Sequence, residues 1–197
     1  MLGNLLLLWL AALPLMGSPG PATLSTAAVG ATYGARRGLP WLAGICRGTA
    51  TVLLLIATGV TAVVLTVPAL KIAITLLAAA YILWLAWRIA TAPPLSRQTE
   101  EAKAPAFPGG YLLAVANPKA FAAIGAVYAG HTVVAGDLAT DAAVKIAALS
   151  LVIVLVNATW LVFGAMISTA LHDPKKSRVV NVLFALLLVA SVAVALF

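Results

Sequence analysis

Residues 107–134 read FPGGYLLAVANPKAFAAIGAVYAGHTVV, an apolar stretch that is interrupted at Ala116-Asn117-Pro118-Lys119. The stretch is longer than the roughly 20 residues that a straight helix needs to cross a bilayer. Asn117 is a favourable N-cap, and Pro118 suits the first helical position, where its missing N–H removes no hydrogen bond. The sequence therefore predicts a membrane-spanning segment in which one helix stops and a second begins.

The composition of the whole chain places it in a membrane. Of 197 residues, 63% are hydrophobic and 9% are charged, whereas a soluble domain carries roughly 25% charged residues. The apolar segments are continuous rather than alternating, which favours helices over the strands of a membrane barrel. We expect one all-α integral membrane domain over residues 1–197.

Charged and Pro/Gly-rich positions divide the chain into six predicted spans. Their approximate limits are 3–35, 42–66, 68–88, 107–134, 143–171 and 178–197. The hydrophilic linker at 91–106 separates them into two groups of three. No Lys or Arg precedes the first apolar stretch, so we expect it to be a span and not a cleaved signal peptide.

Basic residues predict the orientation of these spans. The first, third and fifth connections with their flanks hold Arg36, Arg37, Arg47, Arg88, Arg97, Lys103, Lys175, Lys176 and Arg178. The second and fourth connections hold Lys71 and Lys145. By the positive-inside rule, the first, third and fifth connections are cytoplasmic and both termini lie outside.

The first span is interrupted in the same way as the fourth, at Gly17-Ser18-Pro19-Gly20-Pro21. Pro19 and Pro118 are 99 positions apart, about half the chain, and we expect Ser18 to cap a half-helix as Asn117 does. Three spans per half predict two inverted repeats, about 1–90 and 107–197, with a substrate site at the two breaks. The alternative is that these prolines only kink two packed helices.

Lys119 falls close to the middle of its predicted span. A cation in the first turn of a helix opposes the helix dipole, so the placement predicts a bound anion. No Asp or Glu is expected within any span, so we expect the anion to be a substrate carboxylate. The alternative is that the side chain snorkels to the interface. The predicted substrate-binding residues are Pro19, Gly20, Pro21, Asn117, Pro118 and Lys119, with Ser18, Thr49, Tyr81 and Asn157 as possible cavity-lining residues.

Several classes of site are not expected. Cys46 is the single cysteine, and His131 and His172 are far apart, so no metal site is predicted. The basic residues form no stripe with aromatic residues, which disfavours nucleic-acid binding. The spans hold no set of acid, base and nucleophile, so we expect no enzyme activity and no cofactor. His131, near the end of a span, is predicted to be interfacial.

Glycines and aromatic residues predict how the helices pack. Glycines at four-residue spacing, Gly30-Gly34-Gly38 and Gly44-Gly48, allow close contact between helices, within one chain or in a homodimer. The aromatic residues predicted to anchor the chain at the membrane interface are Trp9, Trp41, Trp84, Trp87, Trp160, Tyr33 and Tyr111.

These motifs together resemble a known family. The chain is similar to the lysine-exporter/homoserine-threonine-exporter superfamily (LysE/RhtB type) in the segments Ser18-Pro19-Gly20-Pro21, Arg36-Arg37-Gly38-Leu39, 79–88, Phe107–Tyr111 and Ala116–Ala120. The resemblance implies six helices, a prokaryotic inner-membrane location and export of amino acids driven by the proton gradient. It also implies that the two Pro-containing motifs form the site.

One departure from the family concerns the substrate. Family members that export basic amino acids have an acidic residue in the second span, near where this chain reads Cys46-Arg47-Gly48-Thr49. Its absence favours small neutral amino acids as substrates. We therefore expect a secondary active exporter of neutral amino acids in the lipid bilayer. The alternatives are a passive channel, a carrier for another small organic anion, or a structural membrane subunit.

Overall fold

The computed structural model describes residues 1–59, 68–92, 104–170 and 174–196, and within these ranges the chain is helical and contains no strand. The helices are α1 (Leu2–Gly17), α2 (Pro21–Tyr33), α3 (Ala35–Ala57), α5 (Pro68–Thr91), α6 (Phe107–Val115), α7 (Pro118–Gly130), α8 (Leu138–Ala170) and α9 (Pro174–Leu196). The all-α prediction is confirmed. Most of the predicted linker at 91–106, and the end of the second predicted span, lie outside the described residues.

Both predicted breaks are present. Helices α1 and α2 meet at an angle of 64°, and α6 and α7 meet at 60°. Asn117 caps α7 as predicted, since its side-chain oxygen accepts a hydrogen bond from the N–H of Lys119 at 3.1 Å. The predicted cap at Ser18 is wrong. Ser18 ends α1, with its hydroxyl donating to the carbonyl of Leu15, and α2 begins after Gly20.

Helices α3 and α8 are each long and apolar enough to cross a membrane, and so is each bent pair when counted as one span. The structure therefore contains between two and four candidate spans among the described residues. Two predicted boundaries were wrong, because α3 begins at Ala35 and α8 at Leu138, both earlier than expected. The full set of six spans remains a prediction.

The second half of each broken helix leads into a long helix in a different way. Gly34 alone separates α2 from α3, and its φ of 80° lies in the left-handed region that favours glycine. The predicted Gly30-Gly34-Gly38 stripe is therefore divided between two helices. Between α7 and α8, Asp137 accepts hydrogen bonds from the backbone N–H groups of Ala139 and Thr140 and from the Thr140 hydroxyl. These hydrogen bonds hold the pKa of Asp137 below its usual value, and the bond from the Thr140 hydroxyl has the largest effect.

Glycines bring two helix pairs into backbone contact. A Cβ added at Gly30 or Gly164 would overlap the facing backbone, so α2 and α8 approach each other more closely than side chains would allow. Helices α3 and α6 are held in the same way by Gly44, Gly48 and Gly110. The prediction that small residues form packing faces is confirmed for these pairs.

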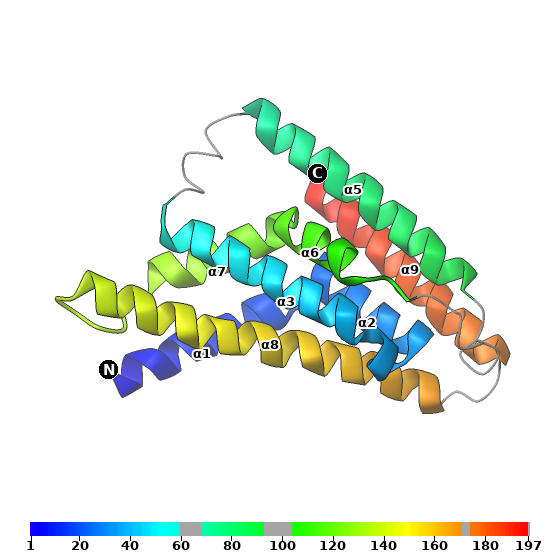
Figure 1. Ribbon diagram of the computed structural model, residues 1–197, viewed down its shortest axis with the longest axis horizontal. Coiled ribbons are helices and arrows are strands. Elements are labelled where there is room, and N and C mark those ends of the chain that lie inside the picture. The colour runs from blue at the N-terminus through cyan, green and yellow to red at the C-terminus, as the bar shows by residue number, and fades with distance from the viewer. Residues whose placement is uncertain (60–67, 93–103, 171–173, 197) are drawn as a thin grey trace.

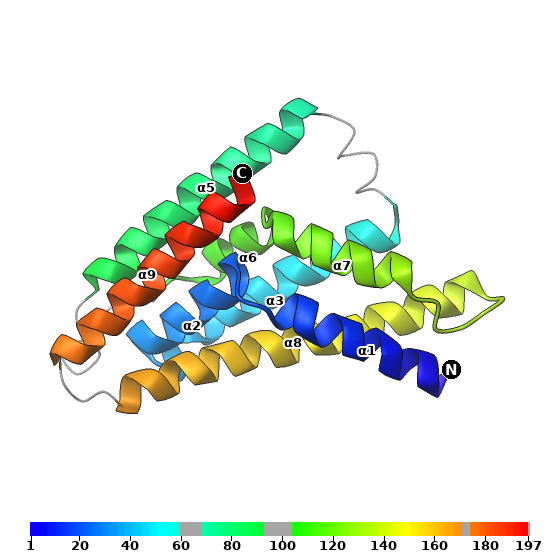
Figure 2. The ribbon, with the colours of Figure 1, turned by 180° about the vertical axis from the view of Figure 1, so that it is seen from behind.

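The molecule has two apolar cores at its two ends. In Figures 1 and 2, α1 and α7 lie towards the end that holds the N-terminus, and α2 and α6 lie towards the other end. One core joins residues of α1, α7 and α8, and the other joins α2, α5, α6 and α9. Helix α3 contributes to both cores, and the breaks in the two bent helices fall between them.

The seven predicted interface anchors differ in exposure, and three of them, Trp9, Tyr111 and Trp160, are partly buried. Trp84 and Trp87 are 45% and 64% exposed on α5, in agreement with the prediction. Trp41 and Tyr33 are buried in the core, so the prediction was wrong for them. Gly109 and Gly110 of α6 explain the burial of Trp41, since added Cβ atoms there would lie 3.2 Å from Cζ3 of the indole ring and 2.5 Å from the Trp41 carbonyl oxygen.

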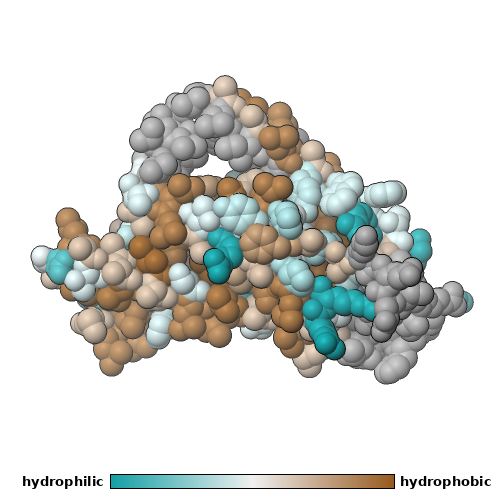
Figure 3. Space-filling view, viewed as in Figure 1, coloured by the Kyte–Doolittle hydropathy of each residue, from teal (hydrophilic) through white to brown (hydrophobic). Residues whose placement is uncertain are grey.

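Large apolar side chains cover much of the surface. Leu10, Leu77 and Trp87 are each more than 60% exposed, and many other large apolar side chains are exposed to a smaller extent. Figure 3 shows apolar residues across most of the coloured surface, with the most hydrophilic residues confined to a few small clusters. Such extended apolar surface is unusual in a soluble monomer and is typical of helices that face lipid.

A buried ion pair near the start of α8 contradicts the prediction that no acid lies within a span. Asp141 and Lys145 are 6% and 7% exposed, and their charged groups are 2.8 Å apart. Asp141 also accepts hydrogen bonds from the N–H groups of Val133 and Val134. Lys145, predicted in a loop, donates to the carbonyls of Tyr128 and His131. The pair therefore fastens the α7–α8 connection to α8.

We expect Asp141→Ala to lower the free energy of unfolding by about 3–5 kcal/mol, because it leaves a buried ammonium and two backbone N–H groups without their acceptor. Asp141→Asn is the matched control, since it keeps an acceptor oxygen for those N–H groups and should cost less. Unfolding in detergent, followed by tryptophan fluorescence, measures both variants. Equal stability of the Asp141→Ala variant and the wild type would show that the ion pair does not support the fold.

Candidate functional site

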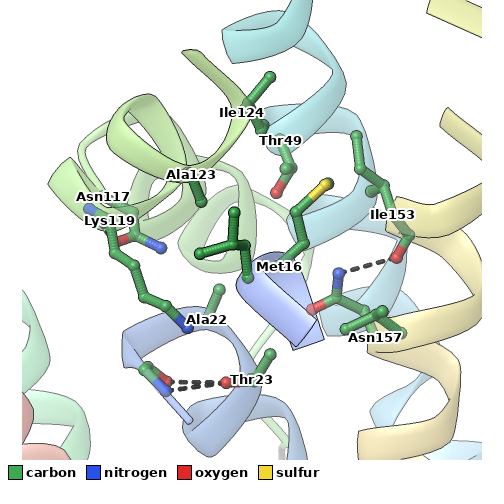
Figure 4. Close-up of a pocket in the computed structure, with 14 residues that line it drawn as sticks. Met16, Ala22, Thr23, Thr49, Asn117, Lys119, Ala123, Ile124, Ile153 and Asn157 are labelled. Carbon is green, nitrogen blue, oxygen red and sulfur yellow. Dashed lines mark hydrogen bonds between the residues drawn. The ribbon is translucent and has the colours of Figure 1, made fainter. Parts of the chain in front are cut away.

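A cavity lies between the two cores, at the level of both helix breaks (Figure 4). It is partly open, and about 440 Å³ of space within its outline, open solvent included, is not filled by atoms. Its walls come from α1, α2, α3, α7 and α8. The lining residues are Leu15, Met16, Gly20, Ala22, Thr23, Thr49, Asn117, Lys119, Ala120, Ala123, Ile124, Ile153, Val156 and Asn157.

The two breaks meet at Lys119. Its side chain is half-buried and crosses from the start of α7 to the other break, where the ammonium group donates to the carbonyl oxygens of Ser18 and Pro19. Gly20 makes this crossing possible, because an added Cβ there would lie 2.6 Å from Cδ of Lys119. The sequence predicted no Asp or Glu partner for Lys119, and within the described part of the chain its partners are these two carbonyl oxygens.

The two half-helix N-termini differ in how many N–H groups they leave free. At α7, Asn117 already accepts from the N–H of Lys119 through its side chain and from that of Ala120 through its carbonyl. At α2, the first N–H with an acceptor in its own helix belongs to Leu24. The preceding N–H groups, those of Ala22 and Thr23, have no acceptor among the described residues, and both residues line the cavity. The positive end of α2 is therefore the better place for an anion.

Thr23 holds the start of α2 in shape. Its hydroxyl oxygen accepts from the N–H of Gly20 at 2.9 Å, and the hydroxyl lies 3.2 Å from the carbonyl oxygens of Ser18 and Gly20. The sequence prediction missed Thr23. Its position three residues after the N-cap, where a side chain can reach back to the cap, was the available signal.

The predicted site residues are brought together in part. Gly20, Asn117, Lys119, Thr49 and Asn157 line the cavity. The other predicted residues do not line the cavity: Ser18, Pro19, Pro21, Pro118 and Tyr81. Ser18 and Pro19 nevertheless contribute the carbonyl oxygens that bind Lys119. Tyr81 packs against the core that joins α2, α5, α6 and α9, with its hydroxyl next to Gly109 of α6.

The charge of the cavity is simple. Among its fourteen lining residues, all in the described part of the chain, Lys119 is the only charged one. Four lining side chains are neutral and polar, those of Thr23, Thr49, Asn117 and Asn157, and the others apart from Lys119 and Gly20 are apolar. Such a site favours a small ligand that carries a negative charge. It disfavours a ligand with a cationic side chain, because the lining contains no acid to pair with it.

Comparison with known proteins agrees with this geometry. A family model described as LysE type translocator matches residues 2–197, which include both broken helices. The chain belongs to this family. The resemblance seen in the sequence motifs is therefore confirmed, and the apolar helices are those of a membrane-embedded, multi-pass transporter.

Relatives of this LysE type translocator include the cysteine/O-acetylserine efflux proteins of Salmonella choleraesuis (strain SC-B67), Salmonella paratyphi A (strain ATCC 9150 / SARB42) and Salmonella typhi. Each is 37% identical over 76 residues. The match covers 39% of this chain and 39% of each relative, so it spans less than half of either protein. No solved structure is a significant match to the chain.

Proposed function

We propose that this LysE type translocator exports small neutral amino acids, or close derivatives, across a prokaryotic cytoplasmic membrane, in exchange for protons. The observation that carries the proposal is the cavity at the two helix breaks, with one ammonium group and the free N–H groups of α2 at its wall. Cysteine and O-acetylserine, named for the Salmonella relatives, are both small and neutral and are the first substrates to test.

The α-carboxylate of the substrate would bind between Lys119 and the N-terminus of α2. Lys119 already reaches that end of α2 through the carbonyls of Ser18 and Pro19, so a carboxylate there meets a cation and a helix dipole together. Cationic side chains are disfavoured, because no Asp or Glu lines the cavity to neutralise them.

Transport would follow from the two-fold organisation of the chain. We propose six spans in two inverted repeats with both termini outside, α5 and α9 being the third and sixth spans. Their 24 and 23 residues extend about 35 Å each at ~1.5 Å per residue. Rocking of one repeat against the other would expose the cavity to each side in turn.

We propose that the glycine contacts form the gate on one side of the cavity. Backbone-to-backbone contact joins α2 with α8 and α3 with α6, on one side of the breaks. On the other side, α1, α3, α7 and α8 pack through apolar side chains instead. In the proposed orientation the side with the backbone contacts is cytoplasmic.

Efflux from proteoliposomes tests the proposal. Vesicles loaded with labelled cysteine, serine, alanine and lysine would be followed with and without an imposed pH gradient. We expect saturable loss of the neutral amino acids, faster with the gradient, and counterflow when unlabelled substrate is added outside. Absence of amino-acid efflux from correctly inserted protein would contradict the proposal. Efflux that neither saturates nor shows counterflow would favour a passive channel.

A further inference from the structure

Asn157 of α8 carries an unpaired polar atom at the wall of the Lys119 cavity. The residue is 5% exposed and lines the cavity. Its Nδ2 donates to the carbonyl of Ile153 at 2.8 Å, whereas Oδ1 is buried and has no hydrogen-bond partner within the described part of the chain. Figure 4 shows the Nδ2 bond running to the Ile153 carbonyl, with the oxygen on the other branch of the amide, on the Met16 side.

The orientation of this amide follows from its partner. The group that faces the Ile153 carbonyl must be the NH₂ group, because turning the amide over would place two acceptor oxygens against each other. The acceptor therefore faces away from α8 backbone and towards the cavity. The two ends of the Asn157 amide are therefore not interchangeable.

The other polar side chains of the cavity do not satisfy this oxygen. The Lys119 ammonium binds the carbonyls of Ser18 and Pro19, and the Thr23 hydroxyl is engaged at the start of α2. A buried acceptor without a donor destabilises the protein, so its presence at a ligand cavity indicates that a ligand supplies the donor. The oxygen is a neutral acceptor on the opposite wall from Lys119 in Figure 4.

We propose that Asn157 is a substrate-recognition residue whose Oδ1 accepts a hydrogen bond from the ammonium group of the amino acid. The inference rests on the proposed function, in which Lys119 and α2 take the carboxylate. An amide oxygen can bind an ammonium group without adding a negative charge that would repel the carboxylate. Met16 stands beside it, and this unbranched side chain can move aside to admit the ligand.

The test compares cysteine with 3-mercaptopropionate, which differs by lacking the ammonium group. Competition by each compound for labelled-cysteine transport gives its apparent affinity in proteoliposomes kept under reducing conditions. For Asn157→Leu we expect cysteine to bind about 10- to 100-fold more weakly, the effect of one charged hydrogen bond, while 3-mercaptopropionate changes little. The preference for the amino acid over its deaminated analogue is therefore lost.

Two further variants separate recognition from structure. Asn157→Asp keeps an acceptor at this position and should retain the preference for cysteine, whatever happens to the absolute rates. Asn181→Leu is the matched control, because Asn181 is also buried and partly unpaired but lies outside the cavity. It should leave the preference unchanged. The melting temperature of Asn157→Leu should stay close to that of the wild type, because the variant loses the Nδ2 bond to the Ile153 carbonyl but also removes a buried acceptor that has no donor within the described part of the chain.

The outcomes distinguish this inference from the function on which it rests. If the wild type transports cysteine and Asn157→Leu weakens both compounds equally, or neither, the ammonium contact is wrong and the exporter stands. If Asn157→Asp loses the preference, the contact is also wrong. If the wild type transports no amino acid, the proposed function fails and the inference fails with it.

Discussion

Replacement of Lys119 by Met is expected to reduce amino-acid transport by about 10- to 100-fold or more while the protein still inserts and folds. Lys119 supplies the only charge among the residues that line the cavity. Its loss removes the charge-assisted contact to the substrate carboxylate, and such contacts contribute about 1.5–3 kcal/mol in a buried site. It also removes the link between the two breaks, because the ammonium no longer binds the carbonyls of Ser18 and Pro19.

Controls for this prediction come from the same chain. Methionine matches the Lys119 side chain as far as Cε, so most of the packing against Gly20 is preserved while the charge is lost. Lys176→Met makes the same change on the exposed start of α9 and should leave transport unchanged. Transport rates per inserted molecule are measured in proteoliposomes. Normal transport by folded Lys119→Met protein would refute the carboxylate site.

The breaks were predictable because local chemistry determines them. Asn117 followed by Pro118 specifies the start of a helix through a side-chain acceptor and a residue that lacks an N–H, and neither effect depends on the rest of the fold. At the first break the same reasoning chose Ser18 wrongly. Thr23 reaches back to the N–H of Gly20, so the cap there comes from a residue inside the helix, and the start of α2 moves accordingly.

The Asp141–Lys145 pair was not predictable from charge counting. A hydropathy pattern treats both residues as the end of a loop, because each is hydrophilic by itself. Their spacing of four residues lets them pair on one helix face. The carbonyls and N–H groups at the end of α7 satisfy the remaining hydrogen-bonding groups. Burial of this kind depends on tertiary partners, and a single sequence does not reveal them.

Trp41 in the core and Asn157 at the cavity also depend on tertiary contacts that a single sequence does not reveal. An indole at the edge of an apolar segment is usually interfacial, yet Gly109 and Gly110 of α6 make room for Trp41 inside the protein. Asn157 was predicted as a possible lining residue, and it lies at the wall of the cavity described above. That its oxygen lacks a partner follows only from the carbonyl of Ile153, which fixes the amide.

Gly164→Ala is expected to lower the free energy of unfolding by about 1–3 kcal/mol and to slow transport. A Cβ at Gly164 would overlap the carbonyl oxygen of Ala27, so α2 and α8 must move apart along their whole contact. Backbone cannot turn aside as a flexible side chain can, and overpacking of this kind costs about that much. Because α2 also forms the wall of the cavity, its displacement would change the site as well as the fold.

Gly125→Ala makes the same substitution on α7 and should act in the opposite direction. An added Cβ at Gly125 meets nothing within 4 Å, and alanine is about 1 kcal/mol more favourable than glycine inside a helix. We therefore expect this variant to be at least as stable as the wild type and to transport normally. Thermal unfolding and efflux, measured on both variants in parallel, test the pair. Equal stability of the Gly164→Ala and Gly125→Ala variants would show that the α2–α8 contact relaxes without cost. That contact would then not act as a gate of the cavity.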